Sequence, residues 1–296
     1  MVFLCIDIGG TNTLFGIGNG DFQVVEKMRT QRFLEDMDAV IDETLKEVDR
    51  DRQEIEKVAI AAAGPIDRDE KVFYPPNFLS SSKMEEVDLG KFFSRADEMK
   101  IVNDCTSAVI GEYYYGDHGT ENLVYITISS GIGAGVILNG DVIEAADGNF
   151  GEIGHMKVGG DLQCGCGGKG HWEAYCSGRN LTQMAEEFFQ AEFEDAKSIF
   201  DAYERHDAKA EKTIAEMHEI NSAGIANVTN MYNPEKIILG GAVPLNHPEI
   251  IIEPLKDQVE DDSVNRTPEI EPCELGEKSV LHGLRAVCNG KYNPGK

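Results

Sequence analysis

The chain has 296 residues, 41% of them hydrophobic, which is enough for one large domain or two ordinary ones with a real core. Its 53 acidic and 27 basic residues give a formal net charge of −26, which opposes binding to nucleic acid or to an anionic membrane. No apolar run approaches the ~18 residues of a membrane span and no secretion signal is visible, so we expect a cytoplasmic protein.

The acidic residues are spread along the chain rather than gathered in a tail. This distribution is typical of proteins that work in high salt, and we carry a halophilic origin as a hypothesis, although lysine remains fairly common. The seven cysteines are odd in number and unevenly placed, which does not fit a secreted disulfide framework. Three of them lie between 164 and 176, which indicates a metal site instead.

The first predicted elements are a buried strand over 2–8 and a second strand over 13–18, joined by a glycine turn. Paired glycines with exposed amides suit close approach to phosphate oxygens, and Asp7 at the end of the strand could hold a metal ion. A plain hairpin turn is the alternative, and both can hold at once. The candidate phosphate-binding residues are Gly9, Gly10, Thr11 and Asn12.

The next stretch completes an α/β unit. A third strand is expected over 24–29, apolar residues at three- and four-residue steps predict an amphipathic helix over 33–48, and 58–63 reads as a buried strand. The prolines in 74–78 require a loop.

A candidate catalytic carboxylate follows at Asp104. Residues 100–102 predict a short strand that stops at Asn103, and 106–115 resembles a helix. A carboxylate at a strand end is in a usual place for chemistry. The alternative is that Asp104 caps the following helix.

The pattern of strand, glycine turn and strand recurs at 123–128, 129–135 and 136–138. This recurrence suggests a second α/β unit built like the first, and two such units could clamp the phosphates of a nucleotide. The candidate residues of the second turn are Ser130, Gly131 and Gly133.

The remaining elements are mostly helical. Helices are expected over 181–189, through the acidic stretch 192–219 and over 220–231, then a strand over 236–239 and a closing helix over 278–289. The charged stretch is a solvated face. A third glycine turn follows the strand, and its spare backbone could admit adenine or ribose at Gly240 and Gly241.

A cluster of metal-ligand residues lies between the second and third turns. Two imidazoles and two thiolates, separated by glycines that let a short loop wrap an ion, suit tetrahedral zinc. Four ligands leave no open position, so the metal should be structural. Cys176 could replace one ligand, and a redox pair or unbound thiols are the alternative. The predicted ligands are His155, Cys164, Cys166 and His171.

Two carboxylates, Glu152 and Glu173, bracket this cluster. Folding the loop around zinc would bring them near one another, and a carboxylate pair can accept hydrogen bonds from sugar hydroxyls. Solvated surface glutamates would be the ordinary explanation for either one alone.

These motifs together resemble the ROK family of sugar kinases and repressors, over nearly the whole chain and in the expected order. The first turn is similar to the family's first phosphate motif, the second to its second, and 239–243 to its adenosine-side turn. Residues 103–112 are similar to its catalytic stretch, 152–155 to its Glu-x-Gly-His signature and 164–173 to its zinc loop. The closest likeness within the family is to glucokinases.

The resemblance implies an α/β fold with the two lobes of an actin-like (ribonuclease H-like) ATPase and a structural zinc loop. We expect a small lobe of residues 1–104 plus 280–296 and a large lobe of residues 105–279. It also implies ATP, Mg²⁺ and structural Zn²⁺ as cofactors, a homo-oligomer such as a dimer or tetramer, and closure on sugar.

The implied reaction is ATP-dependent phosphorylation of glucose to glucose 6-phosphate. Asp104 would take the proton from the 6-hydroxyl as it attacks the γ-phosphate, and Asp7 would lie on the metal side. His155 would give one ring nitrogen to zinc and the other to the sugar. The residues expected to hold the sugar are Asn77, Asn103, Asp104, Glu152, His155 and Glu173.

Three departures from the family pattern leave alternatives. His171 stands where the family usually has a third cysteine, a tryptophan common after Asn77 is lacking, and the loop 63–66 lacks the family's second glycine. Two of these loops are expected near the sugar, so N-acetylmannosamine, fructose or mannose remain alternative substrates.

A sugar-responsive regulator is a rival, but it needs a DNA-binding head, and the chain opens on its first strand. A polyphosphate donor would need a basic track that is not found.

Overall fold

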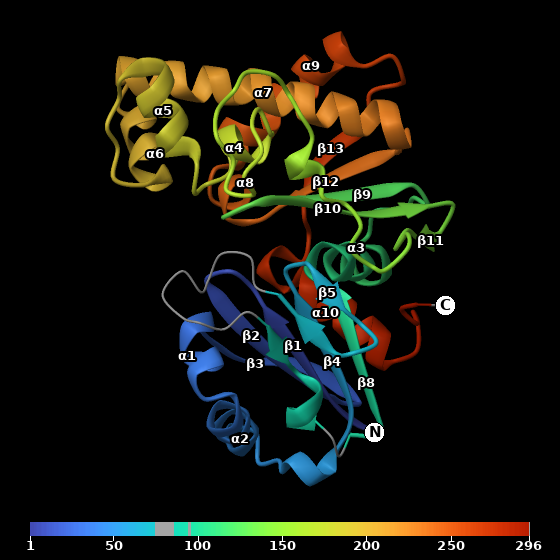
Figure 1. The fold of residues 1–296 in the computed structure, drawn as a ribbon. Coiled ribbons are helices and arrows are strands. Elements are labelled where there is room, and N and C mark those ends of the chain that lie inside the picture. The colour runs from blue at the N-terminus through green and yellow to red at the C-terminus, as the bar shows by residue number, and fades with distance from the viewer. Residues whose placement is uncertain (75–85, 94–95, 296) are drawn as a thin grey trace. The chain divides into compact units, whose positions relative to one another are not determined.

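The computed structural model describes residues 1–74, 86–93 and 96–295. The chain divides into two compact units (Figure 1). The first contains Met1–His118, Val142–Phe150 and Glu277–Lys296, and the second contains Gly119–Asp141 and Gly151–Gly276. Within the described part of the chain, no helix is both long and apolar enough to cross a bilayer.

The first unit is built on a five-stranded sheet and three small strands. Its elements are β1 (Val2–Ile8), β2 (Asn12–Asn19), β3 (Asp21–Arg29), α1 (Thr30–Glu35), α2 (Met37–Glu47), β4 (Ile55–Ala62), β5 (Ile66–Asp67), β6 (Val72–Phe73), β7 (Val87–Asp88), β8 (Glu98–Asn103), α3 (Asp104–Tyr115) and α10 (Ser279–Cys288).

The second unit is built on another five-stranded sheet, and α7 contacts α4, α5, α6 and α9. Its elements are β9 (Leu123–Ile128), β10 (Ile132–Leu138), β11 (Asp141–Val142, at the boundary), α4 (Glu173–Cys176), α5 (Leu181–Phe189), α6 (Ala196–Glu204), α7 (Ala208–Tyr232), β12 (Lys236–Gly240), α8 (Ala242–Asn246), α9 (Pro248–Asp262) and β13 (Glu269–Pro272).

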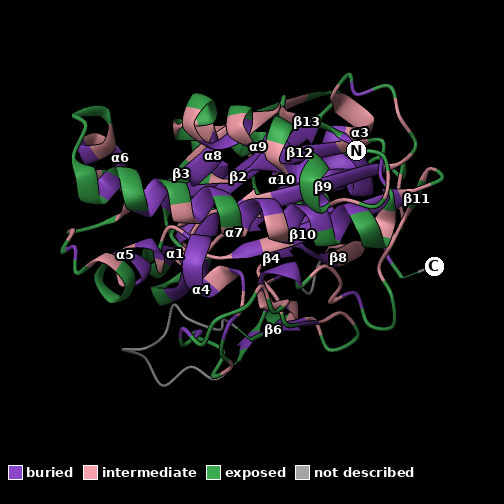
Figure 2. Ribbon diagram, turned by 90° about the horizontal axis from the view of Figure 1, so that it is seen from above, coloured by how far each residue is buried: buried purple, intermediate pink, exposed green. Residues whose placement is uncertain are grey.

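The first sheet has the strand order β3-β2-β1-β4-β8. The hairpin strands β1 and β2 are antiparallel, whereas β1, β4 and β8 are parallel. Parallel strands covered on both faces need apolar residues throughout, and all seven residues of β1 are buried. Figure 2 shows such buried segments in purple. The parallel arrangement brings the carboxyl ends of β1, β4 and β8 to one edge.

Alternation along β1 divides the core of this unit between the two faces of the sheet. Leu4 and Ile6 pack in a cluster with Phe33 and Ile41 of the first two helices, while Cys5 packs with Leu281 of α10. The period of two in a strand is the reason, since neighbouring side chains point to opposite faces. The sheet therefore has helical layers on both faces.

The second sheet repeats the plan of the first. Its order is β11-β10-β9-β12-β13, with β9 and β10 antiparallel and with β9, β12 and β13 parallel. In both sheets the central strand pairs with its antiparallel hairpin partner on one side and with a parallel strand on the other. The predicted recurrence of strand, glycine turn and strand thus corresponds to a recurrence of sheet topology.

Several elements and boundaries differ from the sequence prediction. The helix expected over 33–48 is two helices, because Asp36 adopts a non-helical conformation and its carboxylate accepts the backbone N–H of Ala39 as the cap of α2. β10 begins at Ile132, so the second glycine turn is shorter than predicted. Helix α9 and strand β13 were not predicted at all.

A further difference concerns the boundary between lobes that was expected at 104. Helix α3 belongs to the first unit, because it packs along α10 and the hydroxyl of Ser107 donates to the Val280 carbonyl over 2.8 Å. The segment Val142–Phe150 also returns to this unit.

Candidate functional site

The carboxyl edge of the first sheet gathers the predicted acidic residues. Ile8 pairs with Ala62, and Ala62 pairs with Asn103, so the ends of β1, β4 and β8 are level. Asp7 is the penultimate residue of β1, and Asp104 directly follows β8. The register thereby places two carboxylates at the same edge, where open parallel sheets bind their ligands.

Both carboxylates have perturbed acidity. Burial raises the pKa of Asp7 to about 8, and the negative charge of Asp104 adds to the shift. Burial also raises the pKa of Asp104, while the backbone N–H of Cys105, which donates to Oδ1 over 2.8 Å, opposes it. Asp104 remains partly exposed. A reachable carboxylate with a raised pKa is suited to act as a general base.

The cap of α3 is Asn103 and not Asp104. The Asn103 side-chain oxygen accepts the backbone N–H groups of Cys105 at 2.9 Å and Thr106 at 3.1 Å. The alternative role considered for Asp104, helix capping, is therefore filled by its neighbour. It also means that the side-chain amide nitrogen of Asn103 is the atom with which this residue could meet a ligand.

The first glycine turn is braced by a residue that sequence reasoning missed. Gly9 N–H donates to the Asn12 carbonyl over 3.1 Å. The Thr30 hydroxyl donates to the Gly9 carbonyl over 2.6 Å, and its backbone N–H donates to the Thr11 carbonyl over 3.0 Å. Thr30 is buried at the start of α1, and a single threonine twenty residues away carries no recognisable pattern in sequence.

The carboxyl edge of the second sheet carries the other two glycine turns. Gly240, at the end of β12, pairs with Thr127 near the end of β9. Gly241 has φ of 87°, and a Cβ there would meet the Ile128 carbonyl oxygen at 2.6 Å, so only glycine fits. The turn after β9 and the turn after β12 are therefore adjacent. Gly133, predicted in the second turn, lies inside β10 opposite Thr127.

Glu173 lies against the second glycine turn. Its Oε2 accepts the Ile132 backbone N–H over 3.0 Å, and a Cβ on Gly131 would stand 2.7 Å from the same oxygen. The Gly178 N–H donates to the Ser129 carbonyl over 2.7 Å on the same turn. The carboxylate predicted to meet a sugar is thus joined to the turn predicted to meet phosphate.

The predicted metal ligands come together. One ligand atom from each of His155, Cys164, Cys166 and His171 lies within 4.8 Å of the others. The closest thiol–imidazole pair is Cys166 Sγ and His171 Nδ1, at 3.2 Å. Two thiolates and two imidazoles at this spacing are the donor set of a tetrahedral zinc site.

His155 presents its two ring nitrogens to different neighbours. Nδ1 is 3.8 Å from Cys164 Sγ, whereas Nε2 is 3.8 Å from a carboxylate oxygen of Glu152. The ring can therefore use one nitrogen toward the metal ligands and the other toward Glu152. The expected double use of His155, toward zinc and toward the sugar, stays a prediction.

Comparisons with known proteins decide the family. The ROK family profile matches residues 3–289. The chain belongs to the ROK family. A glucokinase from Pyrobaculum calidifontis is 30% identical over 236 residues, 79% of each chain. The structure of a ROK glucokinase from Streptomyces griseus in complex with glucose and AMPPNP has a TM-score of 0.77 at 25% identity, covering 96% of this chain and 98% of that one. A Bacillus spizizenii xylose repressor is 26% identical over 78% of this chain and 60% of its own length.

Two remaining predictions on this ROK chain have different outcomes. Asn77 lies outside the described residues. Cys176 is fully buried in α4, and its thiol donates to the Met217 carbonyl at 3.6 Å, so it lies apart from the four clustered ligands.

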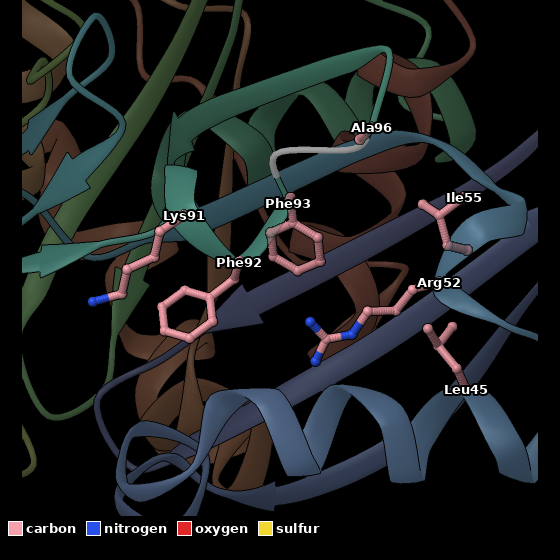
Figure 3. Close-up of a pocket in the computed structure, with 7 residues that line it drawn as sticks. All are labelled: Leu45, Arg52, Ile55, Lys91, Phe92, Phe93 and Ala96. Atoms are coloured by element: carbon pink, nitrogen blue, oxygen red, sulfur yellow. The ribbon is translucent and has the colours of Figure 1, made fainter.

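A cavity of about 200 Å³ in the first unit lies at the other end of the sheet (Figure 3). Ile55, which begins β4, lines it, whereas the candidate carboxylates lie where β4 ends. Arg52 also lines it, but its guanidinium is held at 2.6 Å by both Asp38 and Asp42. This cavity is therefore separate from the carboxyl edge that bears Asp7 and Asp104.

Proposed function

We propose that this chain is a glucokinase, which transfers the γ-phosphoryl group of ATP to the 6-hydroxyl of glucose. Its membership in the ROK family and its likeness to glucokinases support an ATP-dependent hexose kinase. The observation that carries the proposal is the pairing of two carboxylates, the buried Asp7 and the partly exposed Asp104, at the carboxyl edge of a sheet that also bears a glycine turn.

Asp104 is the proposed general base. Its raised pKa makes the ionised carboxylate a stronger proton acceptor, and its partial exposure leaves it open to a substrate hydroxyl. It would accept the proton of the sugar hydroxyl while that oxygen attacks the γ-phosphorus and ADP leaves. Phosphoryl transfer needs mainly positioning and charge neutralisation, and the carboxylate would supply the positioning of the hydroxyl together with the acceptor for its proton.

Asp7 is the proposed carboxylate on the side of Mg²⁺, because a divalent cation would offset the cost of burying its charge. The first turn would bind phosphate oxygens through its amides, with Thr30 holding its shape. The remaining nucleotide contacts would come from the two turns of the second unit. The proposed nucleotide-binding residues are Asp7, Gly9, Gly10, Thr11, Asn12, Ser130, Gly131, Gly133, Gly240 and Gly241.

Polar side chains from both units are proposed to hold the sugar. Asn103 would donate through its amide nitrogen, since its oxygen caps α3. Glu152 and His155 lie close enough to act on neighbouring hydroxyls. Glu173 already accepts Ile132 N–H with one oxygen, so its other oxygen would meet the sugar. Asn77 is a further proposed contact from the sequence.

His155, Cys164, Cys166 and His171 fit Zn²⁺ by the chemistry and spacing of their ligand atoms. Bound there, the metal would supply structural cross-linking and no open coordination position. His155 would be oriented by its Nδ1, leaving Nε2 directed to Glu152 and the sugar.

We expect a homo-oligomer, a dimer or tetramer, that works in the cytoplasm.

The test is a panel of sugars with Mg-ATP. Glucose, N-acetylmannosamine, fructose and mannose are each supplied, and the position of the new phosphate is found by NMR. We expect the highest kcat/KM with glucose and a phosphate on its 6-oxygen. Preference for another hexose would overturn the substrate, and transfer to none would overturn the function.

A sugar-responsive regulator is the second candidate, because the xylose repressor is a relative over 78% of this chain. The net charge of −26 opposes contact with a DNA backbone. Tight, sugar-sensitive binding of the purified protein to duplex DNA, together with no phosphoryl transfer, would favour it over the kinase.

A further inference from the structure

The Gly9 carbonyl, in the first glycine turn, is held by a chain of two hydroxyl groups. The Thr30 hydroxyl donates to this carbonyl over 2.6 Å, and the hydroxyl oxygens of Thr13 and Thr30 lie 3.0 Å apart. A threonine hydroxyl carries a single hydrogen, so Thr13 must be the donor to Thr30. Both threonines are buried, Thr13 at 0% and Thr30 at 1% exposure. The order of donors therefore runs from Thr13 through Thr30 to Gly9.

The backbone of Thr30 holds a second carbonyl of the same turn. Strands β2 and β3 pair Asn12 with Arg29, so Thr30, which follows Arg29, stands beside the residue before Asn12. The Thr30 N–H donates to the Thr11 carbonyl over 3.0 Å. Thr30 therefore keeps two carbonyls of the turn, those of Gly9 and Thr11, directed toward itself.

The orientation of these two carbonyls fixes the orientation of two amides. In a trans peptide the C=O group and the N–H group of the next residue point in opposite directions, and both peptides here are trans. The Gly10 N–H therefore points away from the Thr30 hydroxyl, and the Asn12 N–H points away from the Thr30 backbone. Two amides that point away from the same residue can donate together to one anion.

An ordinary hairpin turn would use the same groups differently. A two-residue hairpin is closed when the Asn12 N–H donates to the Gly9 carbonyl, and this N–H could then not bind a ligand. The peptide between Gly9 and Gly10 could rotate into that state, because glycine has few restrictions on φ and ψ. The bond from the Gly9 N–H to the Asn12 carbonyl, at 3.1 Å, does not prevent the rotation, since this N–H belongs to the preceding peptide. The Thr30 hydroxyl is the group that holds the Gly9 carbonyl away from the Asn12 N–H.

We propose that Thr30 and Thr13 are positioning residues for the phosphate groups of the nucleotide. Their hydroxyls keep the N–H groups of Gly10 and Asn12 directed at the phosphate oxygens, and neither threonine touches the nucleotide itself. The inference rests on the proposed kinase function. All of these residues belong to the first unit. Binding of the adenosine part of the nucleotide and binding of the sugar should not depend on the two hydroxyls.

The test compares Thr30→Val with Thr30→Ser and with a matched control, Thr213→Val. Valine keeps the shape of threonine without the hydroxyl, whereas serine keeps the hydroxyl. Thr213 is also a buried threonine whose hydroxyl donates to a backbone carbonyl, that of Lys209 over 2.9 Å, but it lies in α7 of the second unit. Calorimetry of each purified protein in the presence of Mg²⁺ measures separate dissociation constants for the ATP analogue AMPPNP, for adenosine and for glucose.

We expect Thr30→Val to raise the dissociation constant of AMPPNP about tenfold, because hydrogen bonds that serve a charged ligand are costly to lose. Adenosine and glucose should bind to this variant as they bind to the wild type. Thr30→Ser should bind AMPPNP like the wild type, since its hydroxyl can still hold the Gly9 carbonyl. Thr13→Val is a second variant that keeps Thr30, and it should raise the AMPPNP dissociation constant about threefold.

Equal affinity for AMPPNP in Thr30→Val, Thr13→Val and Thr213→Val would overturn the positioning role. Equal losses of affinity for AMPPNP and adenosine would also overturn it, because the effect would then not concern the phosphate groups. Absence of phosphoryl transfer by a wild-type chain that binds AMPPNP would instead count against the proposed function alone.

Discussion

Asp7 shows what a single buried carboxylate costs the fold. It is 8% exposed, and its pKa of about 8 means that the folded chain favours the neutral acid. An unfolded aspartate has a pKa of about 3.9. The contribution of Asp7 to the free energy of unfolding is therefore fully present below pH about 4. It is lost as the pH rises toward 8, because ionisation is then easier in the unfolded chain than in the folded one.

We predict that Asp7→Asn raises the free energy of unfolding by a few kcal/mol at pH 8 but has little effect near pH 4. The asparagine keeps the shape and cannot ionise. Denaturant unfolding in the presence of EDTA, at several pH values, measures the difference. The exposed Asp21→Asn is the control, because it removes the same formal charge from the surface.

A constant gain at every pH, or the same gain in Asp21→Asn, would contradict the burial argument. The same Asp7 variant should lose phosphoryl transfer if its carboxylate serves the metal. We expect the substitution to raise stability and to lower activity, because the buried carboxylate costs stability but serves the reaction.

At the scale of elements, the proposed zinc loop gives the clearest prediction. The segment from His155 to His171 has little regular structure, so its shape should depend on the metal. We predict that Cys164→Ser loses the zinc ion and lowers Tm, and that it weakens glucose binding through His155.

The matched control is Cys176→Ser, a buried thiol outside the cluster. Metal analysis of the purified proteins should give about one zinc per chain for this control and for the wild type. Zinc retained in Cys164→Ser, or lost equally in both variants, would remove the proposed ligand set.

The elements that sequence predicted well are those with strong local patterns. The buried strand Leu123–Ile128 was predicted with its observed bounds, because its β-branched run stops at two serines. Helix α9 was missed because it carries Pro254 in its interior, which normally breaks a helix. β13 is a short, charged strand at a sheet edge, and its four residues, ending at Pro272, are too few for the alternation around Ile270 to identify a strand.

The candidate site was predictable in its residue types but not in its contacts. The four ligands of the cysteine–histidine cluster follow from composition and spacing, and the structure brings them together. The bond from Glu173 to Ile132 and the brace from Thr30 to Gly9 join residues 41 and 21 positions apart. Such contacts depend on sheet register, which no local pattern reports.

At the scale of the whole molecule, the charge of −26 remains the unexplained feature. Self-repulsion at this charge destabilises the compact state, and salt screens it over ~10 Å at 0.1 M. We predict that Tm and activity both rise between about 0.1 M and about 1 M KCl.

Thermal unfolding and initial rates across a KCl series would check this. Full stability and full activity in dilute buffer would remove the halophile hypothesis. Because the site residues are not part of that argument, the kinase proposal would be unaffected.

The most direct test of the central claim is Asp104→Asn. The substitution keeps the shape of the side chain but removes the base, so kcat for glucose phosphorylation should fall by roughly 10²–10⁴-fold. Glucose affinity, zinc content and Tm should stay near their wild-type values. A kcat close to that of the wild type, in a folded and zinc-loaded variant, would contradict the account.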